Sequence, residues 1–313
     1  MQRTFRALLA LLLLFAVAPC PTLAQGGLQG LPEKRQLSDA ERQQIKGFCD
    51  QHIPGLSQGP LEIKRSRETL LKYLIDPKVI SGDFRREYAL WLLPSLQQLV
   101  KDKSDLKAVN ALQIAGELAT QSIVDLLLGS LKDERVSVRF AAASAIGRMF
   151  DAVRLYEPAV VPAKLMDVVR ELAQLVRTEK DPRVLDALVL AFESALKVPA
   201  DQVNDATFRP SLSTATAKAI GARAKVLPDE PAADRVLAVL LRGVTAMRNA
   251  ATQALLTPRG LPPQQRTDIR DMCSDVLTGV AALRAKGELS GNTARDAEQL
   301  ETAAKSLRDL LAN

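Results

Sequence analysis

Apolar residues recur every three or four positions along most of this chain, with polar residues between them. This spacing places the apolar side chains on one face of a helix, whereas a strand requires strict alternation. No segment alternates convincingly, so the pattern predicts an all-α fold. We expect a first helix from Ser38 to about His52, because Ser38 and Glu41 form a capping box. A second helix over residues 61–75 ends before Pro77.

From Asp83 onward the predicted helices come in pairs that are joined by short turns. The pairs are residues 83–102 with 105–119, 120–133 with 134–150, and 162–180 with 181–197. The second members share one apolar spacing, which is found at Val138, Ala141, Ala142, Ala145 and Ile146, at Val184, Ala187, Leu188, Ala191 and Phe192, and in an earlier copy at Lys107, Asn110, Ala111, Ile114, Ala115 and Gly116. Such repetition predicts an α-solenoid, in which each helical hairpin buries its apolar face against its neighbours.

The stretch over residues 133–147 resembles the second helix of a HEAT repeat, a member of the armadillo-like α-solenoids. The positions that match the family pattern are Asp133, Val138, Arg139, Ala142, Ala143, Ala145, Ile146 and Gly147. The resemblance covers about residues 83–197, and it implies an interaction scaffold that usually lacks catalysis. It also implies that Arg139 meets turn aspartates, with Asp133 and Asp181 as partners, in a structural ladder through the solenoid.

The pattern divides the chain into five parts. These are a signal peptide at residues 1–24, a linker at 25–36, an N-terminal helical cap at 37–80, HEAT-like repeats at 81–197 and a C-terminal helical region at 198–313. The last part contains fewer leucines, and its predicted helices include residues 235–256, 262–285 and 292–312. It is either a set of degenerate repeats or a separate helical bundle, and we favour the bundle.

The N-terminus has the pattern of a secretory signal. Arg3 and Arg6 precede a short apolar run at residues 7–18, and small residues lead to a cleavage site after Ala24. The run is too short to span a bilayer, so we expect a periplasmic or secreted protein without a transmembrane span. A lipoprotein signal ending at Cys20 is the alternative, but proline precedes that cysteine.

Composition and charge narrow the ligand classes. The formal net charge is +6, and removal of Arg3 and Arg6 with the leader lowers it by two. Such a mild excess makes nucleic acid an unlikely partner, since nucleic-acid binding needs a concentrated basic patch. The cysteines left after cleavage, Cys49 and Cys273, both lie on apolar helical stripes, where they are either two buried thiols or a disulfide.

Several fragments resemble catalytic motifs, and each lacks the required context. Residues 55–59 match G-x-S-x-G without a preceding strand or a later histidine, and two S-x-x-K matches begin at Ser104 and Ser194. Cys49 and His52 lie one helical turn apart, but zinc sites normally contain closely spaced ligand pairs on both sides. We therefore expect no enzyme, no cofactor and no metal.

Basic side chains on the repeats remain as candidates for a protein partner, namely Arg85, Arg86, Arg135 and Arg183. The sequence thus favours an exported, non-catalytic scaffold that mediates protein–protein interaction in the cell envelope. The alternative is a helical envelope-polymer hydrolase, or an enzyme accessory, with a carboxylate site that no motif reveals.

Overall fold

The computed structural model describes residues 27–258, 260–287 and 289–312, and it is an all-α solenoid, as the sequence predicts. The predicted signal peptide, residues 1–24, lies outside the described residues. The α-helices are α2 (Asp39–His52), α3 (Pro60–Ile75), α4 (Gly82–Lys101), α5 (Asp105–Leu118), α6 (Gln121–Ser130), α7 (Val136–Leu155), α8 (Pro162–Thr178), α9 (Pro182–Leu196), α10 (Ala200–Val203), α11 (Phe208–Lys225), α12 (Ala233–Leu255), α13 (Pro263–Ala285) and α14 (Gly291–Leu310). Short 3₁₀ helices follow α2 (η1, Ile53–Ser57) and α11 (η2, Leu227–Asp229).

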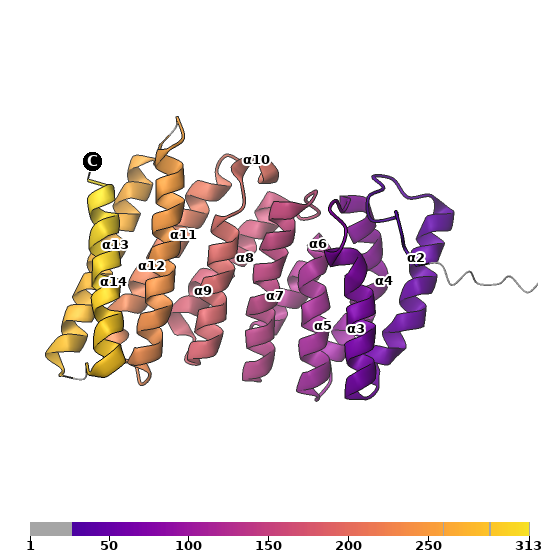
Figure 1. The fold of residues 1–313 in the computed structure, drawn as a ribbon, viewed down its shortest axis with the longest axis horizontal. Coiled ribbons are helices and arrows are strands. Elements are labelled where there is room, and N and C mark those ends of the chain that lie inside the picture. Colours follow the sequence, from indigo (N-terminus) through magenta and orange to yellow (C-terminus); the bar gives the residue numbers. More distant parts are fainter. Residues whose placement is uncertain (1–26, 259, 288, 313) are drawn as a thin grey trace, which may run out of the picture.

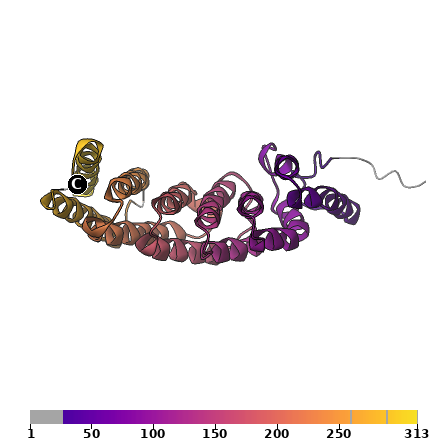
Figure 2. The ribbon, with the colours of Figure 1, turned by 90° about the horizontal axis from the view of Figure 1, so that it is seen from below.

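The helices form antiparallel hairpins that stack side by side into two layers (Figure 1). We call α3, α5, α7, α9, α12 and α14 the inner layer, and α2, α4, α6, α8, α11 and α13 the outer layer. Each inner helix packs on the next inner helix, most extensively α5 on α7 and α7 on α9. Figure 2 shows that the stack is gently curved, with the inner layer on its concave side.

Small residues on the repeated stripe allow the inner helices to approach closely. Val138, Ala141, Ala142, Ala145 and Ile146 are all buried, and the equivalent stripe that starts at Val184 is buried too. A Cβ added at Gly116 of α5 would lie 2.7 Å from the carbonyl oxygen of Ala145 on α7. The spacing between α5 and α7 therefore requires glycine at that position.

The N-terminal region packs onto the first hairpins. Ser38 caps α2, and its hydroxyl accepts from the Glu41 amide, as the capping box predicts. Residues 27–36 contain no helix, yet Leu28 and Leu31 are buried, and the Ser81 amide donates to the Pro32 carbonyl at 2.7 Å. The segment expected as a linker is therefore fixed against the loop before α4.

The C-terminal helices continue the two-layer stack, so they do not form the separate bundle that we favoured. Helix α11 packs on α8, α12 packs on α9, and one hydrophobic core runs from Leu28 to Leu311. A Cβ at Gly279 of α13 would collide with the carbonyl of Ala224 on α11. The same close approach through glycine thus occurs in both halves of the stack.

Cys49 and Cys273 are buried free thiols, and they do not form the disulfide that the sequence left open. Cys49 lies on α2 and Cys273 on α13, at opposite ends of the solenoid (Figure 1). Burial raises the pKa of both thiols, and that of Cys273 rises to about 11. Within the described part of the chain, no helix combines the length and the apolar character needed to cross a membrane.

Candidate binding surface

A series of grooves follows the inner layer. One of about 390 Å³ lies between α3 and α5, one of about 540 Å³ runs over the N-terminal ends of α5, α7 and α9, one of about 210 Å³ separates α7 from α9, and one of about 340 Å³ separates α9 from α12. Exposed apolar side chains occur along the same layer at Leu106, Phe140 and Leu190. The inner layer therefore carries several hollows, with exposed apolar side chains beside them.

The groove of about 540 Å³ is the most apolar of these hollows. Val109, Val136 and Phe140 form its walls, and Arg135, Arg183, Asp105 and Ser137 surround them. Phe140 is 45% exposed although it is one of few aromatic residues in the chain. The buried stripe of α7 passes through Val138 and Ala141, so helical geometry turns Phe140 away from the core. We name this hollow the Phe140 groove.

Two turns at the edge of this groove share the sequence Lys-Asp-x-Arg-Val. We call residues 132–136 the first turn and residues 180–184 the second turn. In the first turn, Asp133 accepts from the amide of Arg135 at 2.9 Å and pairs with its guanidinium through two bonds of 2.9 Å. Asp181 and Arg183 repeat this arrangement in the second turn, at 2.8 to 3.1 Å.

Arg135 is held further by the preceding hairpin. Its Nη1 donates to the carbonyl of Asp102 at 2.7 Å, and its Nη2 donates to that of Val100 at 2.8 Å, at the end of α4. These carbonyls have no partner within their own helix, so the guanidinium satisfies them. Arg135 therefore joins two hairpins, although it also lines the Phe140 groove.

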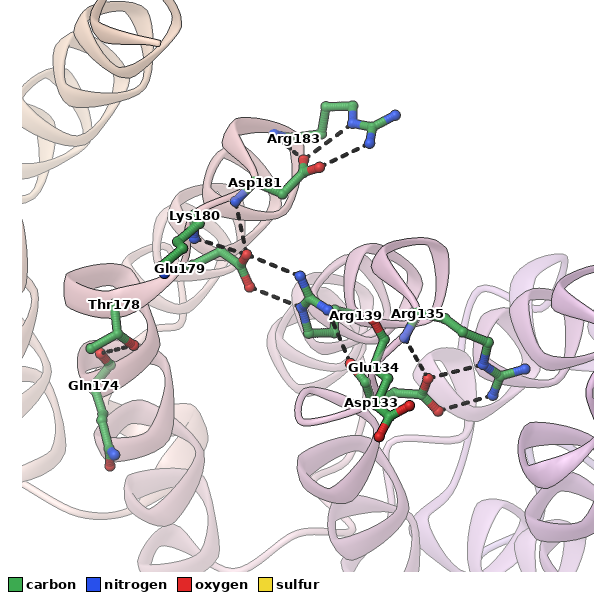
Figure 3. A network of polar contacts seen from close by, with 10 residues as sticks. All are labelled: Asp133, Glu134, Arg135, Arg139, Gln174, Thr178, Glu179, Lys180, Asp181 and Arg183. Atoms are coloured by element: carbon green, nitrogen blue, oxygen red, sulfur yellow. Dashed lines mark hydrogen bonds and ion pairs between the residues drawn. The ribbon is translucent and has the colours of Figure 1, made fainter. Parts of the chain in front are cut away.

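Arg183 extends from the solenoid instead. Its side chain is 69% exposed, and its recorded polar contacts are with Asp181 alone. Figure 3 shows the guanidinium paired with Asp181 and apart from the residues of the first turn. Of the two predicted partner-binding residues that line the Phe140 groove, Arg183 is thus the more exposed.

Arg139 connects the two turns, as the resemblance implies, but its carboxylate partner differs. Its guanidinium forms a two-bond pair with Glu179 at 3.0 and 3.2 Å and donates to the carbonyls of Asp133 and Glu134 (Figure 3). Glu179 also accepts the amides of Lys180 and Asp181. The expected contact with aspartate carboxylates is wrong, because the arginine two residues ahead already occupies each aspartate.

The pairs also shift the acidity of these carboxyl groups. Hydrogen bonding from Arg183 lowers the pKa of Asp181 to about 2, and hydrogen bonding from Arg135 lowers the pKa of Asp133. Burial alone would raise the pKa of Glu179, but Arg139 and the two amides outweigh burial and lower it. All three carboxylates remain charged at neutral pH.

The two remaining candidate arginines lie on the outer-layer helix α4. Arg85 is fully buried beside Tyr156, with its guanidinium 5.9 Å from the ring, and it donates to the Glu157 carbonyl. Burial lowers its pKa to about 10. Its assignment to a partner surface is therefore wrong. Arg86 is exposed, with Asp83 at 3.8 Å, but it lines none of the inner-layer grooves described above.

The fragments that resemble catalytic motifs do not come together into a site within the described residues. Residues 55–57 end η1, and residues 58 and 59 connect it to α3, so helices lie on both sides of this motif. Among the described residues, no group of three or more His, Cys, Asp or Glu side chains is placed to hold a metal ion. One carboxyl group is unusual, because burial raises the pKa of Glu117, which lies 4.0 Å from Arg148.

No protein-family model and no curated protein matches the chain. Among solved structures, an engineered protein is similar with a TM-score of 0.45 and 14% identity, over 84% of this chain and 97% of that one. A designed armadillo repeat protein gives a TM-score of 0.42 at 14% identity, over 81% and 98%. A computationally designed armadillo repeat protein for modular peptide recognition gives 0.41 at 13%, over 81% and 98%.

Proposed function

We propose that this chain is an exported, non-catalytic scaffold whose inner layer binds a segment of a protein partner. The observation that carries the proposal is the alignment of successive grooves along the concave side, with Leu106, Phe140 and Leu190 exposed beside them. Stacked hairpins create long concave surfaces of this kind without any catalytic machinery. Apolar side chains on such a surface supply the anchor contacts that protein interfaces require.

Export is supported by the basic, apolar and small-residue pattern of residues 1–24. A partner in the periplasm or outside the cell is consistent with that pattern. The mild net charge and the interleaving of acidic and basic side chains favour protein over nucleic acid as the partner.

Site-directed photo-crosslinking tests the proposal. A benzoylphenylalanine replaces Leu190 on α9 in one variant and Leu90 on α4 in the control, because both leucines are exposed but lie in opposite layers. After irradiation in an extract of the source cells, we expect a discrete protein adduct at position 190 and none at position 90. Equal labelling at both positions, or labelling at 90 alone, would contradict binding by the inner layer.

One observation favours a second function, hydrolysis of an envelope polymer. The pKa of Glu117 is raised by burial, and Arg148 and Asp151 line the nearby groove between α7 and α9. A carboxyl group whose pKa is raised by burial, close to a second carboxyl group, is an arrangement that general acid catalysis uses. Turnover of cell-wall polysaccharide that disappears in Glu117→Gln but persists in Glu134→Gln would establish this function, and no turnover would remove it.

A further inference from the structure

We propose that the partner segment is acidic and places an apolar side chain in the Phe140 groove while its carboxylates face Arg183 and the neighbouring lysines. This inference rests on the proposed function and specifies the chemistry of the partner. It depends on two properties of one edge of the inner layer, namely the apolar hollow and the charges that surround it.

The hollow is suited to one large apolar side chain. Val109, Val136 and Phe140 come from two adjacent helices, and the groove volume of about 540 Å³ exceeds that of a single aromatic side chain. Burial of an aromatic side chain there would also cover the exposed face of Phe140. An apolar anchor in a preformed hollow is the usual centre of a binding site for a peptide.

The charges at this edge are sorted by sign. The edge consists of the loops that precede α5, α7 and α9, at residues 101–107, 130–137 and 177–183. The exposed basic residues there are Lys101, Lys103, Lys132, Arg177, Lys180 and Arg183. The exposed acidic residues are Asp105 and Glu134.

The sorting has a structural cause. The other carboxylates of these loops are engaged within the protein. Asp133, Glu179 and Asp181 accept backbone amides and pair with arginines, and Asp102 accepts the Ser104 amide and pairs with Lys107. Acidic residues are thereby used to stabilise the turns, and the basic residues remain in solvent. The exposed residues of these loops therefore carry a larger positive net charge than all residues of the loops taken together.

An acidic peptide fits these features better than nucleic acid does. A nucleic acid would contact the lysines through phosphates, but the Phe140 groove beside them is apolar and is bordered by the acidic Asp105. A peptide supplies both carboxylates and an apolar side chain at short spacing. The Nε and Nη2 of Arg183 pair with Asp181, which leaves Nη1 to donate to a carboxylate of the peptide.

Fluorescence anisotropy with synthetic peptides tests the inference. The probe is a labelled twelve-residue peptide with one central phenylalanine and four glutamates, and matched peptides carry glutamine or lysine in place of the glutamates. We expect the mature protein to bind the glutamate peptide about tenfold more tightly than the glutamine peptide. This comparison changes only the peptide, so it does not depend on the folding of a variant.

Protein variants then locate the contact. Arg183→Gln and Phe140→Ala should each weaken binding of the glutamate peptide about tenfold. The matched controls are Arg170→Gln, since Arg170 is 67% exposed and pairs with Asp167 on outer helix α8, and Leu90→Ala on outer helix α4. Both controls should leave the affinity unchanged within about twofold.

Each contrary result has one interpretation. If the glutamine or lysine peptide binds as tightly as the glutamate peptide and remains sensitive to Phe140→Ala, the acidic specificity is wrong and the inner-layer function stands. If no peptide binds, the inference is also wrong, and the crosslinking at position 190 decides the proposed function separately. If a twelve-nucleotide single-stranded DNA binds more tightly than the glutamate peptide at the same salt concentration, the inferred peptide partner is wrong and nucleic acid is favoured.

Discussion

The two Lys-Asp-x-Arg-Val turns have the same local geometry and different surroundings. In both, the aspartate accepts from the arginine amide and pairs with its guanidinium. Arg135 in the first turn has a side chain that is 26% exposed and donates to two carbonyls of the preceding hairpin. Arg183 in the second turn is exposed and makes no recorded contact with a preceding hairpin.

The difference arises from the neighbouring loop and not from the motif. The first turn lies against the end of α4, where the carbonyls of Val100 and Asp102 accept from Arg135. The corresponding loop beside the second turn contains Asp133, and its carbonyl already accepts from Arg139. One local motif therefore stabilises the stack at one position and remains available to a partner at the next.

The largest effect is expected at the contact that joins the two turns. Glu179→Gln removes the charge that Arg139 faces in a largely buried pair and weakens the acceptor for two amides. Arg139→Gln leaves the Glu179 carboxylate without its counter-charge. We expect each change to lower the free energy of unfolding by about 3 kcal/mol, measured by urea denaturation.

The double variant is the control for that pair. If Arg139 and Glu179 interact directly, the loss in the double variant is smaller than the sum of the two single losses by about 1 kcal/mol or more. Strictly additive losses would show that the two turns are joined by other contacts.

The next largest effect is expected at Arg135. Arg135→Gln loses the pair with Asp133 and leaves the carbonyls of Val100 and Asp102 without a charged donor. We expect a loss of about 2 kcal/mol in urea denaturation, because several hydrogen bonds to a charged group disappear together. A loss no larger than that of Arg183→Gln would contradict the structural difference between the two turns.

Acid should affect the two turns alike, because both contain the same aspartate–arginine pair. The pKa of Asp181 is about 2 in the folded chain, against an ordinary 3.8, and the pKa of Asp133 is lowered as well. A lowered folded pKa contributes stability above pH 3.8 that is lost as the pH falls toward 2. The variants Asp133→Asn and Asp181→Asn should therefore both have a lower free energy of unfolding than the unmodified chain at pH 7. Between pH 3.8 and pH 2, the free energy of unfolding should fall less in each variant than in the unmodified chain. Urea denaturation at a series of pH values measures how the free energy of unfolding depends on pH. A different pH dependence in the two variants would show that the two aspartate–arginine pairs contribute unequally to stability.

The smallest effect on stability is expected at Arg183. Its pair with Asp181 is exposed, and such pairs contribute little to folding. Arg183→Gln should change the free energy of unfolding by less than about 0.5 kcal/mol, by the same urea measurement. A loss comparable to that of Arg135→Gln would mean that Arg183 supports the stack and is not available to a partner.

Helix periodicity was enough to predict the hairpins and their buried faces. The positions from Val138 to Ile146 and from Val184 to Phe192 are buried in the predicted register, since burial of a helical stripe is a local property of the sequence. The same reasoning could have predicted that Arg85 is buried and not part of a partner surface. It shares the spacing of Tyr88, Ala89 and Leu92, which are all buried.

Contacts between hairpins were harder to predict because they depend on side chains that are distant in the chain. Arg139 was assigned to turn aspartates, but the contact with Glu179 depends on where the end of α8 lies. The stacking of α11 and α13 was missed because it relies on small residues such as Ala224 and Gly279, which leave no strong apolar pattern. Phe140 could have been noticed as a large aromatic side chain off the buried stripe.

Hydrogen–deuterium exchange with a bound peptide tests the central claim, that the inner layer is the binding surface, most directly. The peptide is selected on the mature protein from an unbiased display library. Amide exchange rates of the protein with this peptide bound are then compared with those of the free protein. The account predicts slowed exchange at the N-terminal ends of α5, α7 and α9, near Phe140 and Arg183, with α4, α6 and α8 unchanged. Slowed exchange confined to α4, α6 and α8 would contradict it.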